Sequence, residues 1–248
     1  MNITDKILEI DNTPWRLFEP NDDKEWCVLW LQGFRSTIEG HTPGVIRLAE
    51  TTSTSFAMLD YAGHGSHHVL LDDATREQQF NEVVGVYDEL IKLGFKKIIV
   101  IGGSFGGYMA ALLAGKPYIE TLVLRAAANY PEEEFKLAFR DTSVGRKDFE
   151  NFLYRQNIDE HYTNDAIESV RGFDGETYVI QHENDEVINS SIPKSYYNAA
   201  KHGNYIVIPK VKHSPKLMSD PGKYFELIEL WLTTIITATK KSEKLQDS

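Results

Sequence analysis

The chain has 248 residues, of which 42% are hydrophobic and 25% are charged, with a formal net charge of −11. This length and composition fit one globular domain with a sizeable core and exclude a largely disordered protein. No block of Lys and Arg offsets the acidic balance, so we expect no binding to nucleic acid or to an anionic membrane surface.

Short apolar runs alternate with helical patterns, which is typical of a mainly parallel sheet with helices on both faces. The first predicted element is an antiparallel hairpin of Ile7–Ile10 and Trp15–Phe18, with Asp11 and Asn12 in its turn. The elements expected next are a buried strand at Cys27–Leu31, a helix at Thr42–Thr51 and a strand at Phe56–Leu59.

The second half of the chain continues this alternation. Glu77–Leu93 has apolar residues at helical spacing and is followed by Gly94 as a C-cap, and Lys97–Ile101 is a β-branched run that predicts a central strand. The remaining predicted elements are strands at Leu122–Leu124, Tyr178–Ile180 and Tyr205–Ile208 and a helix at Asp220–Ala238. We expect the polar end, Lys240–Ser248, to fray.

The single cysteine, Cys27, excludes an internal disulfide, and its apolar neighbours indicate a buried strand thiol rather than a nucleophile. The N-terminus lacks the apolar core of a signal peptide, and no run of about 18 apolar residues occurs. We therefore expect a cytoplasmic protein with no membrane segment and no membrane partner.

A serine between glycines follows the predicted central strand. The sequence Gly102–Gly107 has Ser104 at its centre and leads directly into a helix-forming run. A strand that turns straight into a helix crowds the backbone, and this order places a serine hydroxyl at an exposed apex. The alternatives are a closely packed glycine-rich turn or a phosphate cradle, but the spacing matches neither a P-loop nor a dinucleotide-binding turn.

A serine nucleophile needs a histidine base and a carboxylate that orients it, and in this setting the chain order is serine, acid, histidine. An acidic cluster follows the penultimate strand, and His213 follows the last one. We choose Asp185 as the acid, with Glu183 and Glu186 as alternatives. Asp185 could instead cap the predicted helix at Ser190–Ala200, and His213 could be a solvated loop residue.

The base role of His213 predicts that kcat/KM falls on the acid side as the imidazole takes up a proton. His182 precedes the acidic cluster and is interpreted as a structural residue at a strand end. The cluster of His64, His67 and His68 could bind a metal ion, but the surrounding glycines favour a loop near the mouth of the site.

The tetrahedral intermediate of acyl transfer needs hydrogen-bond donors for its oxyanion. One expected donor is the backbone N–H of Phe105, the residue after the serine, and the second is the N–H of Phe34. Gly33 is expected to permit a close backbone approach there, and Arg35 is interpreted as a solvated charge.

These segments together resemble the α/β-hydrolase superfamily in order and spacing, over about residues 25–235. The segments that carry the resemblance are Gln32–Phe34, Asp60–Gly65, Gly102–Gly107, Arg125–Tyr130, Glu183–Val187 and His213. Within the superfamily the chain looks similar to small serine carboxylesterases of the cinnamoyl or feruloyl esterase kind and to the related acyl-thioesterases. One departure is Gln32-Gly33, where such families often have His-Gly.

The resemblance implies a mostly parallel, eight-stranded twisted α/β sheet in a single domain, residues 1–248, with a small cap at about 131–175. It implies a triad of Ser104, His213 and Asp185, an oxyanion hole from the amides of Phe34 and Phe105, and no cofactor or metal. Aromatic residues of the cap would suit an apolar or aromatic substrate, or would simply pack the cap onto the sheet: Phe135, Phe139, Phe149, Phe152, Tyr154 and Tyr162.

The function expected from these sites is hydrolysis of a small-molecule carboxylic ester through an acyl-serine. Hydrolysis of a thioester, an acyl-peptide or a C–C bond would use the same triad, because the pocket selects the acyl group. A non-catalytic binding protein with a hydrolase fold is a further alternative, and a homodimer is left open.

Overall fold

A computed structural model of the chain describes residues 3–146, 158–214 and 221–244. In this part of the chain, eight strands form one open sheet in the order β1-β2-β4-β3-β5-β6-β7-β8. The strands are β1 (Thr4–Ile10), β2 (Thr13–Glu19), β3 (Trp26–Leu31), β4 (Ser55–Leu59), β5 (Lys97–Gly103), β6 (Ile119–Arg125), β7 (Glu176–His182) and β8 (His202–Ile208). All neighbours from β4 to β8 in this order are parallel, and β1 and β2 pair antiparallel.

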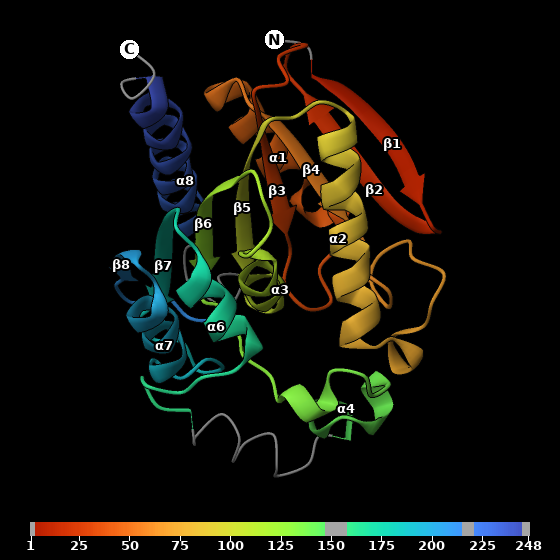
Figure 1. Cartoon of the computed structure of the whole chain (residues 1–248), viewed down its shortest axis with the longest axis vertical. Helices are drawn as coiled ribbons and strands as arrows, with labels where there is room; N and C mark the ends of the chain where they lie inside the picture. The colour runs from red at the N-terminus through yellow and green to blue at the C-terminus, as the bar shows by residue number, and fades with distance from the viewer. Residues whose placement is uncertain (1–2, 147–157, 215–220, 245–248) are drawn as a thin grey trace.

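Helices cover both faces of the sheet (Figure 1). The α-helices are α1 (Ile38–Thr52), α2 (Arg76–Lys92), α3 (Phe105–Leu113), α4 (Ser143–Arg146), α6 (Asp165–Gly172), α7 (Ser191–Ala199) and α8 (Pro221–Lys244), and three short 3₁₀ helices lie at Leu71–Asp73, Glu132–Glu134 and Phe139–Asp141. One hydrophobic core lies between the sheet and α2, α3, α6 and α7, and a second lies between the sheet and α1 and α8. The expected mostly parallel, eight-stranded sheet is confirmed.

The turn residues of the edge hairpin and the apolar runs of the central strands behave as the sequence predicts. Asp11 and Asn12 adopt φ of 48° and 64°, which is the backbone twist of a two-residue turn between antiparallel strands. Every residue of β3 is buried, and so is every residue of β5 after Lys97, because helices cover both faces of these strands. Cys27 is fully buried in β3, as expected.

Helix α1 begins at Ile38, four residues before the predicted start at Thr42. The Thr37 side chain caps it by accepting a hydrogen bond from the Gly40 N–H at 3.2 Å. Pro43 is the sixth residue of the helix and removes the hydrogen bond that an N–H there would donate to the Glu39 carbonyl. The predicted start was wrong because the Thr37 side chain and the Asp60 carboxylate, which accepts from the Ile38 N–H at 2.9 Å, satisfy the first turn of a helix that begins earlier.

Helix α8 extends to Lys244, beyond the predicted end at Ala238. The ammonium group of Lys240 donates hydrogen bonds to the carbonyls of Thr52 and Ser53 at 3.3 Å and to the Thr54 hydroxyl at 2.9 Å. This contact satisfies the C-terminal carbonyls of α1 and ties α8 to it. The expectation that the chain frays from Lys240 was therefore wrong for residues 240–244. No helix in the described residues is long and apolar enough to span a bilayer.

The carboxyl ends of the parallel strands meet at one edge of the sheet, and residues 131–146 extend below that edge (Figure 1). Helix α6, which also falls within the range expected for a cap, packs against α3 in the layer over the sheet. Residues 147–157, with Phe149, Phe152 and Tyr154, lie outside the described residues.

Asp60 connects two segments at this edge. Its side chain is fully buried at the end of β4, and Oδ1 accepts a hydrogen bond from the Ile38 N–H at 2.9 Å. Oδ2 accepts hydrogen bonds from the N–H and the hydroxyl of Ser66 at 3.0 and 3.1 Å. Gly65 wraps tightly around the same carboxylate, at φ of 50°. The carboxylate thus anchors the N-terminus of α1 and the loop after β4 together.

Replacing Asp60 with Ala should lower the free energy of unfolding by about 3 kcal/mol, because it leaves buried donors without an acceptor. The control is Asp174→Ala, which removes an exposed ion pair with Lys201 and should change the free energy of unfolding far less. Urea denaturation of both variants measures the difference. Equal losses in the two variants would show that Asp60 does not anchor these segments.

Candidate active site

Ser104 lies between the last residue of β5 and the first residue of α3, with backbone φ of 51° and ψ of −117°. A residue with a side chain rarely adopts a positive φ, and such strain persists only where the surroundings impose it. The Ser104 N–H donates to the carbonyl of Arg125 at 3.0 Å, and its carbonyl accepts from the N–H of Gly107 at 2.9 Å. The backbone of the serine is therefore held on both sides of the turn.

Two glycines make this turn sterically feasible. A Cβ at Gly102 would lie 2.2 Å from the carbonyl oxygen of Gly106, and one at Gly106 would lie 2.0 Å from that of Leu31. Backbone atoms cannot move away as a flexible side chain can, so neither position accepts a larger residue. Gly33 differs from its expectation, because a Cβ there would meet Gly103 and Ser104 only at an ordinary 3.5 Å.

The three side chains predicted to form a triad come together at the carboxyl edge. Ser104 Oγ lies 3.0 Å from His213 Nε2, and His213 Nδ1 lies 2.8 Å from Asp185 Oδ2. The carboxylate can only accept, so Nδ1 carries the ring proton, and Nε2 is left to accept the hydrogen bond of the serine hydroxyl. This arrangement is a serine hydroxyl bonded to a base that a carboxylate orients.

The side chain of Asp185 is buried, with 4% of its surface exposed. Burial alone would raise the pKa of this carboxyl group, but the hydrogen bond with His213 and the N–H groups of Ile188 and Val187 outweigh burial and lower the pKa. Both N–H groups donate to Oδ1, at 2.8 and 2.9 Å. The carboxylate is therefore ionised and fixed at neutral pH, as an orienting group needs to be.

The two alternative acids have other contacts. Glu186 accepts a hydrogen bond from the backbone N–H of His213 at 3.2 Å, and Glu183 accepts one from the N–H of Lys210 at 2.8 Å. The N–H of Asn184 also donates to the carbonyl of Val211 at 2.9 Å. Both glutamates thus hold the loop after β8 against the loop after β7. Of these three acidic residues, Asp185 is the one that contacts the imidazole ring.

His182 ends β7, is buried and lines the cavity beside Ser104. Burial, aided by the nearby cation of Arg125, lowers its pKa to about 4, so the ring is neutral at neutral pH. Its Nδ1 lies 3.0 Å from the carbonyl of Lys212, which can only accept, so Nδ1 donates. His182 therefore anchors the residue directly before His213, in agreement with a structural role at the strand end.

The amides of Phe34 and Phe105 lie on the two chain segments that border Ser104 in the same cavity. Phe105 is the first residue of α3, and the N–H of a first helical residue has no partner within its helix. The aromatic rings of the two residues contact each other edge to face, with centroids 6.2 Å apart. The placement is compatible with an oxyanion hole, and that role stays a prediction.

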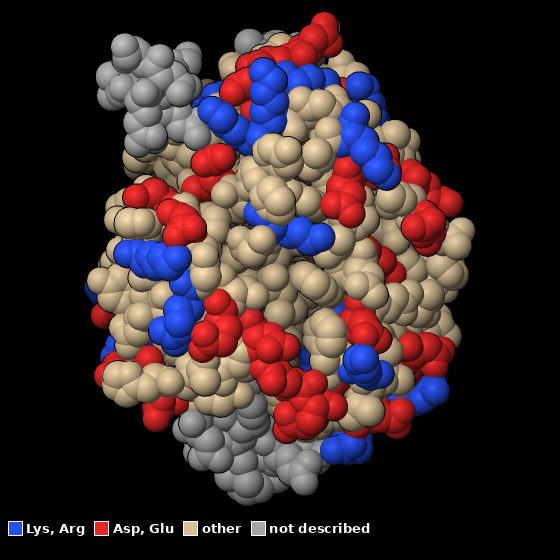
Figure 2. Space-filling view, viewed as in Figure 1, with Lys and Arg blue, Asp and Glu red and all other residues tan. Residues whose placement is uncertain are grey.

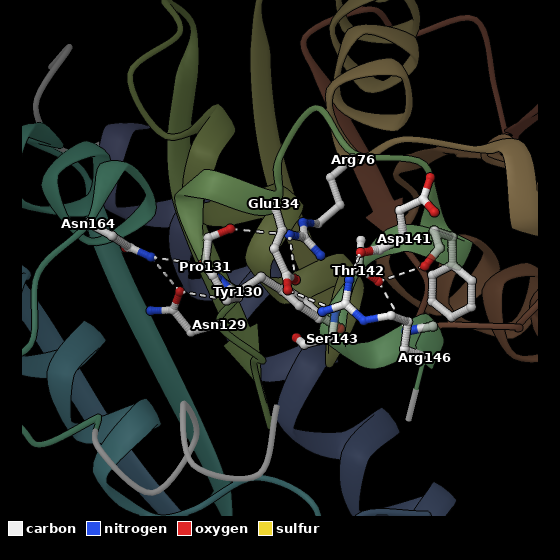
Figure 3. Close-up of polar contacts among 12 residues, drawn as sticks. Arg76, Asn129, Tyr130, Pro131, Glu134, Asp141, Thr142, Ser143, Arg146 and Asn164 are labelled. Carbon is white, nitrogen blue, oxygen red and sulfur yellow. Dashed lines mark hydrogen bonds and ion pairs between the residues drawn. The ribbon is translucent and has the colours of Figure 1, made fainter. Parts of the chain in front are cut away.

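The cavity at the site has a volume of about 570 Å³. Its lining includes Ser104, His213, the loop after β3, the start of α2 and residues from the segment after β6, among them Leu137, Phe139 and Val144. Phe139 packs on Phe34 with ring centroids 5.2 Å apart. Figure 3 shows the polar contacts that fold this segment against α2. Part of the region expected to form a cap thus makes one wall of the cavity.

The histidine-rich loop after β4 packs against the residue that follows Ser104. His64 is buried, and its ring stacks on that of Phe105 at a centroid distance of 5.9 Å. Burial lowers the pKa of His64, so the ring is neutral. The Nε2 atom of His67 lies 3.2 Å from Glu82. Among the described residues, no group of three or more potential ligands could hold a metal ion.

Arg125 is a residue of the site that the sequence interpretation did not single out for a role. It ends β6 and pairs in register with Gly103 of β5. Its guanidinium group covers Gly103, since a Cβ on that glycine would lie 2.6 Å from Nη2. The carboxyl ends of adjacent parallel strands meet at one edge, so the predicted strand at Leu122–Leu124 was a signal that could have placed Arg125 beside Ser104.

Comparison with known proteins places the chain in a family. The sequence model of the uncharacterised protein family UPF0227 matches residues 56–220, about two thirds of the chain. The chain belongs to this family. The match includes Ser104, Asp185 and His213, whereas the segment of Phe34 precedes it. No curated protein sequence matches this UPF0227 member.

Solved structures share the fold of this UPF0227 member at low sequence identity. Est1E from Butyrivibrio proteoclasticus, solved with ferulic acid bound, is 18% identical with a TM-score of 0.70, over 94% of this chain and 96% of that chain. Carboxyl esterase 2 from Tuber melanosporum is 12% identical with a TM-score of 0.70, over 96% and 86%. An esterase from Pyrobaculum calidifontis is 18% identical with a TM-score of 0.65, also over 96% and 86%. These similarities confirm the α/β-hydrolase fold.

The turn at Ser104 predicts a steep dependence on Gly106. Gly106→Ala should lower the free energy of unfolding by about 3 kcal/mol, because the added methyl group overlaps the Leu31 carbonyl. Gly115→Ala is the matched control, since a Cβ there meets no atom within 4 Å, and it should be neutral or stabilising by up to about 1 kcal/mol. Chemical denaturation compares the two. A Gly106→Ala variant as stable as Gly115→Ala would contradict the described turn.

The buried neutral His182 predicts an acid-dependent loss of stability. Its pKa is about 4 in the folded protein against 6.5 in an exposed histidine, so between these pH values the unfolded chain binds more protons. The contribution of the neutral His182 ring to the free energy of unfolding is therefore fully present above pH 6.5. As the pH falls from 6.5 to 4, this contribution decreases by about 3 kcal/mol in total. The advantage of wild type over His182→Gln in unfolding free energy should shrink by that amount between pH 7 and pH 4. A constant difference across this range would refute the burial of a neutral ring.

Proposed function

We propose that this protein is a serine hydrolase that cleaves carboxylic esters through an acyl-Ser104 intermediate. The observation that supports this most strongly is the pair of hydrogen bonds from Ser104 to His213, at 3.0 Å, and from His213 to Asp185, at 2.8 Å, opening into a cavity of about 570 Å³. Proteins named as esterases share the fold, and Est1E was solved with ferulic acid bound. Fold alone does not give a reaction, so the proposal depends on the site.

In the proposed acylation, Ser104 Oγ attacks the carbonyl carbon of the ester while its proton passes to His213 Nε2. The carbonyl oxygen becomes an oxyanion that the N–H groups of Phe34 and Phe105 stabilise. The C–O bond to the alcohol then breaks, and His213 returns the proton to the leaving oxygen. Asp185 keeps Nδ1 protonated and stabilises the imidazolium that forms in between.

Deacylation uses the same groups with water as the nucleophile. His213 takes a proton from the water as it attacks the acyl-serine, and the proton then returns to Ser104 Oγ as the C–O bond of the acyl-serine breaks. The products are the carboxylic acid and the regenerated serine. Every proton transfer in the two half-reactions occurs at Nε2 of His213, and the reaction consumes one water molecule.

Several finer expectations remain part of this proposal. They are the single domain with a cap at about 131–175, the small-molecule ester substrate without nucleic-acid or membrane partners, the cytoplasmic location and the homodimer. Thioester, acyl-peptide and C–C bond hydrolysis would use the same triad, and rates on matched oxyesters and thioesters separate the first of these from ester hydrolysis.

The test is the hydrolysis of p-nitrophenyl butyrate by wild type and by Ser104→Ala. Loss of the nucleophile should lower kcat by about 10⁴-fold or more, because no other group can form the acyl intermediate. Ser190→Ala, at an exposed serine just before α7, is the control and should retain wild-type activity. Equal rates for wild type and Ser104→Ala would exclude Ser104 as the nucleophile.

A further inference from the structure

The two segments expected to supply the oxyanion amides meet through their aromatic side chains. Phe105 is the first residue of α3, whereas Phe34 lies in the loop between β3 and α1. Their rings pack edge to face, with centroids 6.2 Å apart. The helix holds the backbone of Phe105, but a loop residue depends on its own contacts to keep its amide in place. The contacts of the Phe34 side chain therefore help to set the spacing of the two amides.

The ring of His64 lies between these two side chains. It stacks on Phe105, with centroids 5.9 Å and planes 11° apart, and it meets the Phe34 ring edge to face at 5.5 Å. Tyr61 completes the cluster, because its ring packs edge to face against His64 at 5.3 Å and against Phe105 at 5.5 Å. Aromatic pairs in such geometries attract each other beyond the area that they bury. His64 thus contacts both residues whose amides are expected to bind the oxyanion.

One hydrogen bond fixes the orientation of the His64 ring. Its Nδ1 atom lies 3.2 Å from the carbonyl of Ala62, which can only accept, so Nδ1 carries the ring proton and donates. The same carbonyl also accepts a hydrogen bond from Gln79 Nε2 at 2.8 Å. The Ala62 carbonyl therefore keeps a partner when the imidazole is replaced.

The backbone on either side of His64 is closely packed. Gly63 has φ of 80°, and a Cβ there would lie 2.6 Å from the Cα of Leu71. Gly65 has φ of 50°, and a Cβ there would lie 2.1 Å from Asp60 Oδ2. Both φ values lie in the left-handed region that favours glycine. The loop after β4 therefore holds the His64 ring in one position against the serine turn.

The imidazole of His64 is neutral and buried. Charged side chains of both signs are spread over the face of the molecule in Figure 2, whereas His64 is only 3% exposed. Burial lowers its pKa, and the weaker effects of the Ala62 carbonyl and Asp60 do not reverse this. Its Nε2 atom is buried without a hydrogen-bond partner among the described residues, which costs stability. A phenylalanine ring at this position would avoid that cost while keeping the ring contacts.

We infer that His64 is a positioning residue, whose ring packs between Phe34 and Phe105 and sets the spacing of their amides beside Ser104. This inference rests on the proposed function and adds a residue to it. A displacement of about 1 Å at a reacting group can cost on the order of 100-fold in rate, and the loss of one oxyanion donor costs at least as much. The carbonyl oxygen becomes an anion only during the reaction, so the ring contact affects kcat more than KM.

Two substitutions separate the ring of His64 from its hydrogen bond. His64→Asn keeps a side-chain N–H that can donate to the Ala62 carbonyl but removes the ring, whereas His64→Phe keeps the ring and removes the N–H. On p-nitrophenyl butyrate, His64→Asn should lower kcat by roughly 10- to 100-fold and change KM by less than about threefold. His64→Phe should keep kcat within about threefold of wild type. Rates are expressed per folded chain, measured by circular dichroism.

His67→Asn is the matched control, since it makes the same change in the same loop. The side chain of His67 is 1% exposed and contacts Glu82 and His68. His67→Asn should lower the unfolding midpoint but keep kcat within about threefold of wild type. A loss of kcat in His67→Asn or His64→Phe as large as that in His64→Asn would overturn the inference, because the effect would then not come from the ring of His64.

A measurement of amide orientation keeps this inference separate from the proposed reaction. Residual dipolar couplings of the full chain labelled with ¹⁵N-phenylalanine report the direction of each N–H without interference from ring currents. His64→Asn should change the coupling of Phe34 relative to that of Phe105, and His64→Phe and His67→Asn should not. If wild type hydrolyses the ester, unchanged couplings or an unchanged kcat in His64→Asn would overturn the inference and leave the esterase proposal intact. Changed couplings in a chain that hydrolyses no ester would support the positioning of the amides and contradict the proposed reaction.

Discussion

The close contact between the turn at Ser104 and the end of the neighbouring strand is the constraint on which the site depends. Gly106 approaches the Leu31 carbonyl so closely that no side chain fits, and Gly102 meets Gly106 in the same way. Between these two glycines the chain passes from β5 into α3, with Ser104 at a positive φ of 51°. The turn places the Ser104 hydroxyl at the cavity, beside the N-terminus of α3.

The base and the acid are held by loops that support each other. Glu183 and Glu186 accept backbone hydrogen bonds from the loop after β8, and the neutral ring of His182 holds the carbonyl just before His213. These contacts hold the imidazole Nε2 3.0 Å from the serine hydroxyl. Positioning of the catalytic groups and shaping of the substrate cavity are thus carried by different parts of the chain.

The sequence was informative where local chemistry decides the structure. β-branched and apolar runs gave the parallel strands, the Asp11–Asn12 turn gave the edge hairpin, and the strand-turn-helix order around Ser104 gave the candidate nucleophile. It was less informative where distant contacts decide. The start of α1 depends on Thr37 and on Asp60, more than twenty residues away, and the length of α8 on carbonyls at the end of α1. The placement of Arg125 beside Ser104 requires strand order and register, which composition and periodicity do not contain.

The most direct measurement of the central claim is covalent labelling of the whole chain with a fluorophosphonate, followed by peptide mass spectrometry. Such a probe reacts with a serine only when a base activates the hydroxyl and donors stabilise the oxygen anion that forms. The account predicts one phosphonyl group per chain, on the peptide that contains Ser104, and much slower labelling when Asp185 is replaced with Asn. An unlabelled chain, or a label on another residue, would contradict it.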